Sequence, residues 1–134
     1  MEEQVREFHG IRYRLLAKDD IKKYVLGVAR AEWEAKDFDV YGDDLTESVW
    51  GLQELDVEKI KPDRELLRSP AFQEDLRGRT DTMRSMVRKR ELIPPLILRG
   101  SDFHIFDGYA RYSVFLEMRI SRCLAYVGEL SGKK

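Results

Sequence analysis

The sequence predicts a single α+β domain in which a small mixed sheet is flanked by helices. Its 134 residues can bury one hydrophobic core but not two. Residues 96–98 are apolar, residues 100–102 are turn formers, and residues 103–106 are mostly apolar again. This pattern is typical of two antiparallel strands joined by a short loop. Gly108 then allows a sharp turn into a helix, and an apolar strand pattern at residues 123–127 completes the predicted sheet.

The composition is that of a soluble folded protein, with 43% apolar and 37% charged residues. The formal net charge of −1 predicts no strong overall attraction to DNA or to an anionic membrane. No apolar run approaches the ~20 residues that a membrane-spanning helix needs, and the first residues do not resemble a signal peptide. Cys123, the single cysteine, is expected to be buried and unreactive. Together these features predict a cytoplasmic protein without a membrane partner.

Residues 1–51 are predicted to form an N-terminal extension to the core. Alternating apolar and polar residues over 8–16 predict a strand. One face of that strand carries Ile11, Tyr13 and Leu15. The simplest interpretation is that the extension covers one face of the core, and the alternatives are a lid or a surface for another protein.

The rest of the extension is predicted to contain a helix and an acidic loop. Asp19 and Asp20 suit the N-cap and first turn of a helix over residues 21–36, because carboxylates bind the free N–H groups there. Residues 37–44 are acidic, contain a glycine and are predicted to be a loop. Residues 46–52 are predicted to form a further helical turn.

The core is predicted to span residues 52–134. Residues 52–62 are expected to form a strand that a proline ends. A serine–proline pair opens a short predicted helix over residues 69–76. Thr80 is expected to cap a second helix over residues 81–90.

Charge is distributed unevenly along the chain. Residues 32–58 are rich in aspartate and glutamate and contain one base, Lys36, whereas residues 77–99 are rich in arginine. Most charge runs are simply solvated surfaces. The alternative is that the basic segment contacts phosphate, with the acidic segment masking it or meeting it in a neighbouring molecule. Aromatic residues are absent from the basic segment, so stacking on single-stranded bases is not expected there.

The run from Asp107 to Arg111 is predicted to bind an anion. A strand that ends at aspartate and glycine and opens into a helix directs several backbone N–H groups and the helix dipole towards one point. Arg111, one turn into that helix, adds a guanidinium that can form charge-assisted hydrogen bonds to the same anion. The alternative is a purely structural corner whose glycine serves the turn alone.

The run Phe106–Tyr112 resembles the signature of the ParB/sulfiredoxin superfamily (ParB N-terminal-like domains), in which the second strand of a hairpin ends in a glycine-containing motif followed by arginine and a helix. The resemblance extends over about residues 52–130. It implies a ParB/sulfiredoxin-like fold, a nucleotide or phosphate ligand, and contacts from the corner and from the preceding helix. The implied phosphate-binding residues are Gly108, Tyr109, Ala110, Arg111, Ser85, Thr82 and Arg79, and the implied catalytic carboxylate is Asp107.

Departures from the superfamily pattern limit what is implied. Ser85 matches a hydroxyl position directly, whereas Thr82 and Arg79 lie beside the matching positions. Tyr109 stands where sulfiredoxins carry their catalytic cysteine, so reduction of a sulfinic acid is not expected. Ala110 stands where the superfamily carries histidine or arginine, which removes one phosphate ligand.

Two hypotheses of function remain. The first is a protein that binds ATP, another nucleotide or a phosphorylated small molecule, with or without Mg²⁺, and that could act as a phosphotransferase or hydrolase. The second is a non-catalytic module that binds a protein partner, or the DNA backbone through Arg77, Arg84 and Arg88. The sequence contains no Cys/His spacing typical of a metal site, and none is predicted.

Overall fold

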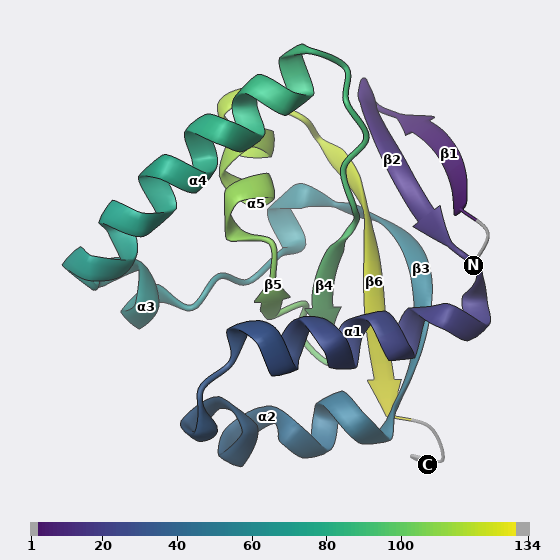
Figure 1. Ribbon diagram of the computed structural model, residues 1–134, viewed down its shortest axis with the longest axis vertical. Coiled ribbons are helices and arrows are strands. Elements are labelled where there is room, and N and C mark those ends of the chain that lie inside the picture. Colours follow the sequence, from purple (N-terminus) through teal and green to yellow (C-terminus); the bar gives the residue numbers. More distant parts are fainter. Residues whose placement is uncertain (1–2, 131–134) are drawn as a thin grey trace.

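The computed structural model of the protein describes residues 3–130, which form two sheets and five α-helices (Figure 1). The strands are β1 (Glu3–Phe8), β2 (Ile11–Leu16), β3 (Ser48–Asp56), β4 (Leu96–Arg99), β5 (Ile105–Asp107) and β6 (Arg122–Leu130). The helices are α1 (Lys18–Glu32), α2 (Ala35–Glu47), α3 (Arg64–Arg68), α4 (Pro70–Arg88) and α5 (Tyr109–Glu117), with a 3₁₀ turn at Val57–Lys59. No helix within these residues is long and apolar enough to cross a bilayer.

The main sheet has the strand order β3–β6–β4–β5 and is mixed. β6 pairs antiparallel with β3 and parallel with β4, and β4 pairs antiparallel with β5. The hairpin of β4 and β5 was predicted from the sequence and is confirmed. The α+β class with a mixed sheet and flanking helices is likewise confirmed.

The sheet separates two hydrophobic clusters, because successive side chains of a strand point to opposite faces. On β4, Leu96 and Leu98 belong to one cluster and Ile97 to the other. The first cluster is covered by α4 and α5, and includes Phe115. The second is covered by α1 and α2, which lie in front of the sheet in Figure 1 and contribute Val25 and other apolar residues.

The hairpin of β1 and β2 packs against the first cluster. Ile11, Tyr13 and Leu15 are buried, which confirms the predicted apolar face. The amide of Arg14 donates to the carbonyl of Ile93 at 2.9 Å and joins the hairpin to the segment that precedes β4. The strand predicted over residues 8–16 corresponds to β2 and the turn before it, and β1 was not predicted.

Two predictions for the extension were wrong. Residues 37–44 belong to helix α2, which begins with a reciprocal capping box between Glu34 and Asp37. Residues 46–52 were predicted to form a helical turn, but residues 48–52 belong to strand β3. Trp50 is buried on this strand, and its indole donates to the carbonyl of Leu45 at 3.0 Å. The predicted boundary between residues 51 and 52 therefore falls inside β3.

Helix α1 begins earlier than predicted. Its N-cap is Ala17, while Asp19 and Asp20 lie in the first turn, where their charge favours the helix dipole. It ends at Glu32, four residues before the predicted end.

Helix α4 is a single helix of 19 residues, whereas the sequence predicted two. Its start is as predicted, because Ser69 caps it by accepting from the amide of Phe72 at 3.3 Å and Pro70 occupies the first position. Thr80 is 7% exposed in the middle of the helix and is not a cap. Gly78 costs an α-helix only about 1 kcal/mol relative to alanine, which the surrounding helix tolerates.

Candidate functional site

The turn from β5 into α5 has the geometry that the sequence predicted. Gly108 adopts φ = 117°, which side chains rarely allow, and α5 begins at the next residue. Tyr109, Ala110 and Arg111, the first residues of the helix, are all buried. Their amides have no earlier helical carbonyl to bind, and no side chain caps this helix. The turn therefore presents unpaired donors at a positive helix end.

Arg111 folds back over this turn. Its Nη2 donates to Oδ2 of Asp107 at 2.9 Å, and only 8% of the residue is exposed. A Cβ atom at Gly108 would lie 2.9 Å from Nη2 and 3.2 Å from Nε of Arg111, so glycine permits the close approach. The Nε atom is buried and has no hydrogen-bond partner among residues 3–130. A buried donor without an acceptor is costly, so this N–H group is suited to a ligand.

A cavity of about 390 Å³, here called the inner cavity, opens beside this guanidinium. Its lining residues come from α1, α4 and the β5–α5 turn. They are Glu32, Gly78, Arg79, Thr82, Met83, Asp107, Gly108, Ala110 and Arg111. Six of the eight site residues predicted from the sequence thus line one cavity.

The two remaining predicted residues lie elsewhere. Ser85 is exposed on α4 and is not part of the cavity lining. Tyr109 lines the neighbouring cavity, where its hydroxyl accepts from the amide of Asp63 at 2.8 Å. Burial raises the pKa of the Tyr109 hydroxyl to about 12, so the group remains a neutral phenol at physiological pH.

The charges of the inner cavity are balanced. Arg111 is paired with Asp107, and Arg79 on α4 is paired with Asp75 at 2.9 Å. The hydroxyl of Thr82 donates to the carbonyl of Gly78 at 3.2 Å. Affinity for an anion would therefore come from directed N–H groups rather than from excess positive charge.

A second cavity of about 860 Å³, here called the outer cavity, adjoins the first. Four residues line both cavities: Glu32, Arg79, Asp107 and Gly108. The outer cavity has seven carboxylates in its lining, from Glu32, Glu34, Asp37, Asp63, Glu65, Asp75 and Asp107. Its basic side chains are Lys36 and Arg79. The outer cavity is therefore strongly acidic.

Aromatic rings form much of the remaining wall of the outer cavity. Trp33 meets Phe106 edge to face at a centroid distance of 5.3 Å, and its indole donates to the Phe106 carbonyl at 3.4 Å. Phe72 meets Tyr109 edge to face, also at 5.3 Å. Sequence reasoning missed this cavity, although the capping box between Glu34 and Asp37 was a readable signal for the helix that closes it.

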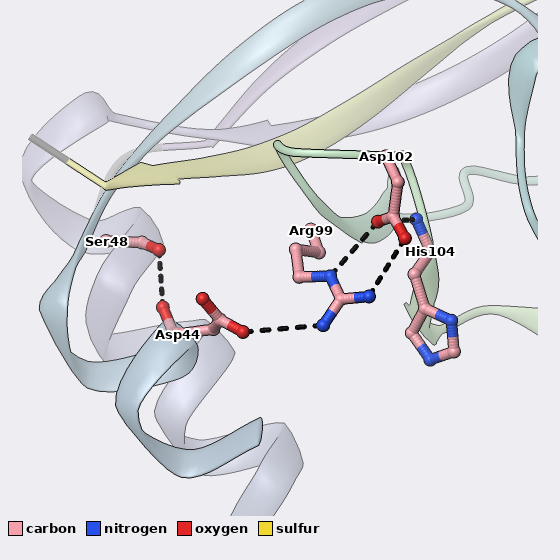
Figure 2. A network of polar contacts seen from close by, with 5 residues as sticks. All are labelled: Asp44, Ser48, Arg99, Asp102 and His104. Carbon is pink, nitrogen blue, oxygen red and sulfur yellow. Dashed lines mark hydrogen bonds and ion pairs between the residues drawn. The ribbon is translucent and has the colours of Figure 1, made fainter. Parts of the chain in front are cut away.

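A polar network holds α2 against the β4–β5 hairpin (Figure 2). Arg99 binds Asp102 through Nε at 3.0 Å and Nη2 at 2.9 Å, and its Nη1 lies 3.5 Å from Asp44 of α2. Arg99 also lies over the ring of Tyr41, 5.2 Å from its centroid. Tyr41 in turn stacks on His104 at 5.0 Å. The network thus fixes Tyr41 and His104, which both line the outer cavity.

The network also shifts the ionisation of its members. The Arg99 guanidinium, which hydrogen-bonds to Asp102, lowers the pKa of that carboxyl. Burial, followed by the nearby charge of Arg99, lowers the pKa of His104. His104 is therefore expected to be neutral at pH 7.

The basic segment is partly neutralised within the chain. Arg84 binds Glu117 of α5 through two nitrogens, at 2.7 and 2.9 Å, and Asp81 at 2.7 Å. These carboxylates raise the pKa of Arg84. Arg77 and Arg88 are exposed on α4 and form no ion pair with another described residue. Within residues 3–130, no group of three or more His, Cys, Asp or Glu side chains is arranged to hold a metal ion.

Comparison with solved structures identifies ParB N-domains and a sulfiredoxin as similar in fold. Two structures of a pNOB8-like ParB N-domain share 22% and 24% identity with this chain, cover 60% and 59% of it, and give TM-scores of 0.43 and 0.41. The match spans only 30% and 27% of those two chains. Sulfiredoxin from Arabidopsis thaliana shares 22% identity over 57% of this chain and 83% of its own, with a TM-score of 0.41.

No model of a protein family and no curated protein matches the chain. The solved structures belong to the two kinds of protein that the run at residues 106–112 resembles.

Proposed function

We propose that the protein binds the phosphate group of a nucleotide, or of another phosphorylated small molecule, in the inner cavity. The observation that carries this proposal is the buried Nε atom of Arg111, which has no partner in the described chain and lies against the uncapped start of α5. Phosphate oxygens accept several hydrogen bonds at once, which suits a guanidinium beside a helix N-terminus.

Asp107 supports this site as a positioning residue. Its carboxylate holds Nη2 of Arg111, and the guanidinium is thereby kept against the turn at Gly108. Because this pair and the Arg79–Asp75 pair leave the cavity without excess positive charge, a phosphate with several charges would bind better together with Mg²⁺. Mg²⁺ commonly binds nucleotides through phosphate oxygens and one or two carboxylates.

A binding experiment with matched arginine variants tests the proposal. Thermal unfolding and calorimetric titration would be measured with ATP, ADP, CTP and GTP, each with and without Mg²⁺. At least one nucleotide should stabilise the wild-type protein, because a ligand that binds only the native state raises its stability. Arg111→Lys keeps a charge for Asp107 but lacks the Nε donor, and should weaken binding about tenfold or more.

Arg122→Lys is the matched control. Arg122 forms an ion pair of the same length, 2.9 Å, with Asp56 and lines neither cavity. This variant should bind the nucleotide as the wild type does. The proposal is wrong if no nucleotide stabilises the protein, or if Arg111→Lys binds as well as Arg122→Lys. Product analysis of the same mixtures would detect phosphoryl transfer or hydrolysis.

The exposed arginines of α4 favour a second candidate function, contact with the DNA backbone. Arg77 and Arg88 lie free of ion pairs with the described residues, whereas Arg84 is held by Glu117. DNA binding through them would weaken steeply with salt. Fluorescence anisotropy of labelled duplex DNA, with Arg77→Ala and Arg88→Ala, measures this contribution.

A further inference from the structure

We propose that the outer cavity docks a basic polypeptide segment of a partner protein, with an arginine or lysine side chain inserted between its aromatic rings. This surface is separate from the proposed phosphate site, although the two share a wall at Asp107 and Gly108. The occupant follows from three properties of the cavity: its charge, its rings and its rim.

The first property is an excess of negative charge in the cavity lining. Seven carboxylates line the outer cavity against two basic side chains, Lys36 and Arg79, which are paired with Glu34 and Asp75 of the same lining. Glu32 and Glu65 are exposed, and neither forms an ion pair within residues 3–130. Their charges are available to a cationic partner, and the same field repels an anionic one.

The second property is the ability of these rings to bind a guanidinium. Arg79 lies over the ring of Phe72, 5.7 Å from its centroid. Arg99 lies over Tyr41 at 5.2 Å. Both rings line the outer cavity, so the chain itself already shows two arginine–ring contacts at this wall. A partner's cation would form the same kind of contact with Trp33, the ring type that attracts cations best.

The third property is an apolar rim, which favours a polypeptide over a small cation. Leu66 of α3 lines the cavity and is 36% exposed. Phe38 of α2 is 38% exposed and packs on Trp33 at 5.2 Å. A segment that alternates basic and apolar residues can cover these exposed side chains while its cations enter the cavity. A polyamine offers no comparable apolar contact.

The two tryptophans of the chain make the test specific. Trp33 lines the outer cavity, whereas Trp50 is 3% exposed, lines neither cavity and donates its indole N–H to the Leu45 carbonyl. A labelled octapeptide of alternating arginine and leucine would be titrated into ¹⁵N-labelled protein. The Trp33 indole resonance should move and that of Trp50 should stay. Anisotropy should give an affinity that falls as NaCl rises from about 50 to about 300 mM.

Matched variants distinguish peptide binding in the outer cavity from attraction to the acidic surface of the protein as a whole. Glu32→Gln with Glu65→Gln removes two carboxylates that form no ion pair with a described residue, and should weaken peptide binding at least about fivefold. Glu58→Gln with Glu74→Gln removes the same charge from exposed residues outside both cavities, and should leave affinity unchanged. Glu32 also lines the inner cavity, whereas Glu65 lines the outer cavity alone, so Glu65→Gln by itself keeps this test independent of the phosphate test.

Five results would overturn the proposal. One is an unmoved Trp33 indole at saturating peptide, and another is equal loss of affinity in both double variants. A third is equal binding of a control octapeptide of alternating glutamate and leucine. The fourth is tighter binding of spermine than of the peptide at Trp33, which would make a small polyamine the occupant. The fifth is self-association of the protein that the peptide inhibits in a dilution series, which would assign the cavity to a second copy of this chain.

Discussion

The inner and outer cavities share a wall but have opposite chemistry. Asp107 and Gly108 line both. On one side the start of α5 and Arg111 present N–H donors, and on the other α2, α3 and α4 present carboxylates and rings. The donors of a helix start all point one way, whereas the elements packed against the other side of the turn set the charge there. The two sides of one strand-to-helix turn therefore differ in the class of ligand that they suit.

The largest difference is expected when the paired arginines of the inner cavity are truncated. Arg111→Ala leaves the mostly buried Asp107 without a partner and should cost about 3 kcal/mol of unfolding free energy or more. Arg79→Ala breaks an exposed pair with Asp75 and should cost less than about 1 kcal/mol. Urea unfolding measures both. Equal losses would show that Arg111 is not a special element of this turn.

A smaller but still clear difference in unfolding free energy is expected when each of two glycines of the inner cavity is replaced by alanine. Gly108→Ala would place Cβ 2.4 Å from Cδ2 of Leu96 at φ = 117°, and should destabilise by about 2 kcal/mol. Gly78→Ala meets no atom within 4 Å in the middle of α4, and should stabilise by up to about 1 kcal/mol. If Gly108→Ala unfolded at the wild-type urea midpoint, the tight turn described for this glycine would be wrong.

Much of the inner cavity could be predicted from sequence because its parts are local. Asp107, Gly108 and Arg111 follow one another in one turn, and the hairpin before them has a clear strand–turn–strand pattern. Asp107 and Arg111 are also only four residues apart, across the turn from β5 into α5. The catalytic role that the superfamily resemblance implies for Asp107 stays a prediction.

The outer cavity could not be predicted in the same way. Its walls come from segments far apart in the chain, and acidic residues 37–44 have the composition of a loop. They are helical because Glu34 and Asp37 cap the helix and because Leu45 is buried under the sheet, and burial is a property of the fold. The first part of β3, residues 48–51, was missed for a related reason, since its partner β6 lies more than sixty residues away, whereas residues 52–56 were predicted to be a strand.

The network beside the outer cavity should make stability depend on pH. Burial lowers the pKa of His104 below its ordinary value of 6.5, so the unfolded chain binds this proton more readily than the native one. Stability should therefore fall as the pH falls through about 6.5. His104→Gln should flatten the profile there. Thermal unfolding across pH 5 to 8 checks this.

The Asp102–Arg99 pair acts in a separate, more acidic window. Because Arg99 lowers the pKa of Asp102, the pair stabilises the native state above the ordinary aspartate pKa, and this contribution is lost as the pH falls through the lowered native value. Asp102→Asn should remove the loss of stability in this acidic range, and should leave in place the loss near pH 6.5 that is assigned to His104. Loss of the His104 step in this variant would show that the two groups titrate as one unit.

The smallest expected effects distinguish two hydroxyls of α4. Thr82 lines the inner cavity and Ser85 does not. If a nucleotide binds there, Thr82→Ala should change its affinity a few-fold, because one polar contact of the wall is lost. Ser85→Ala should change nothing measurable by calorimetry. A larger effect at Ser85 would favour the phosphate position implied by the superfamily resemblance.

One NMR experiment tests the contrast between the two cavities most directly. ¹⁵N-labelled protein would be titrated separately with a Mg²⁺-nucleotide and with the arginine–leucine peptide, following Arg111 Nε–H, the amides of Ala110 and Arg111, and the Trp33 indole. The nucleotide should move the Arg111 and α5 signals and leave the indole unchanged, and the peptide should do the reverse. The account is contradicted if both ligands move the same signals, or if the nucleotide leaves Arg111 Nε–H where it was.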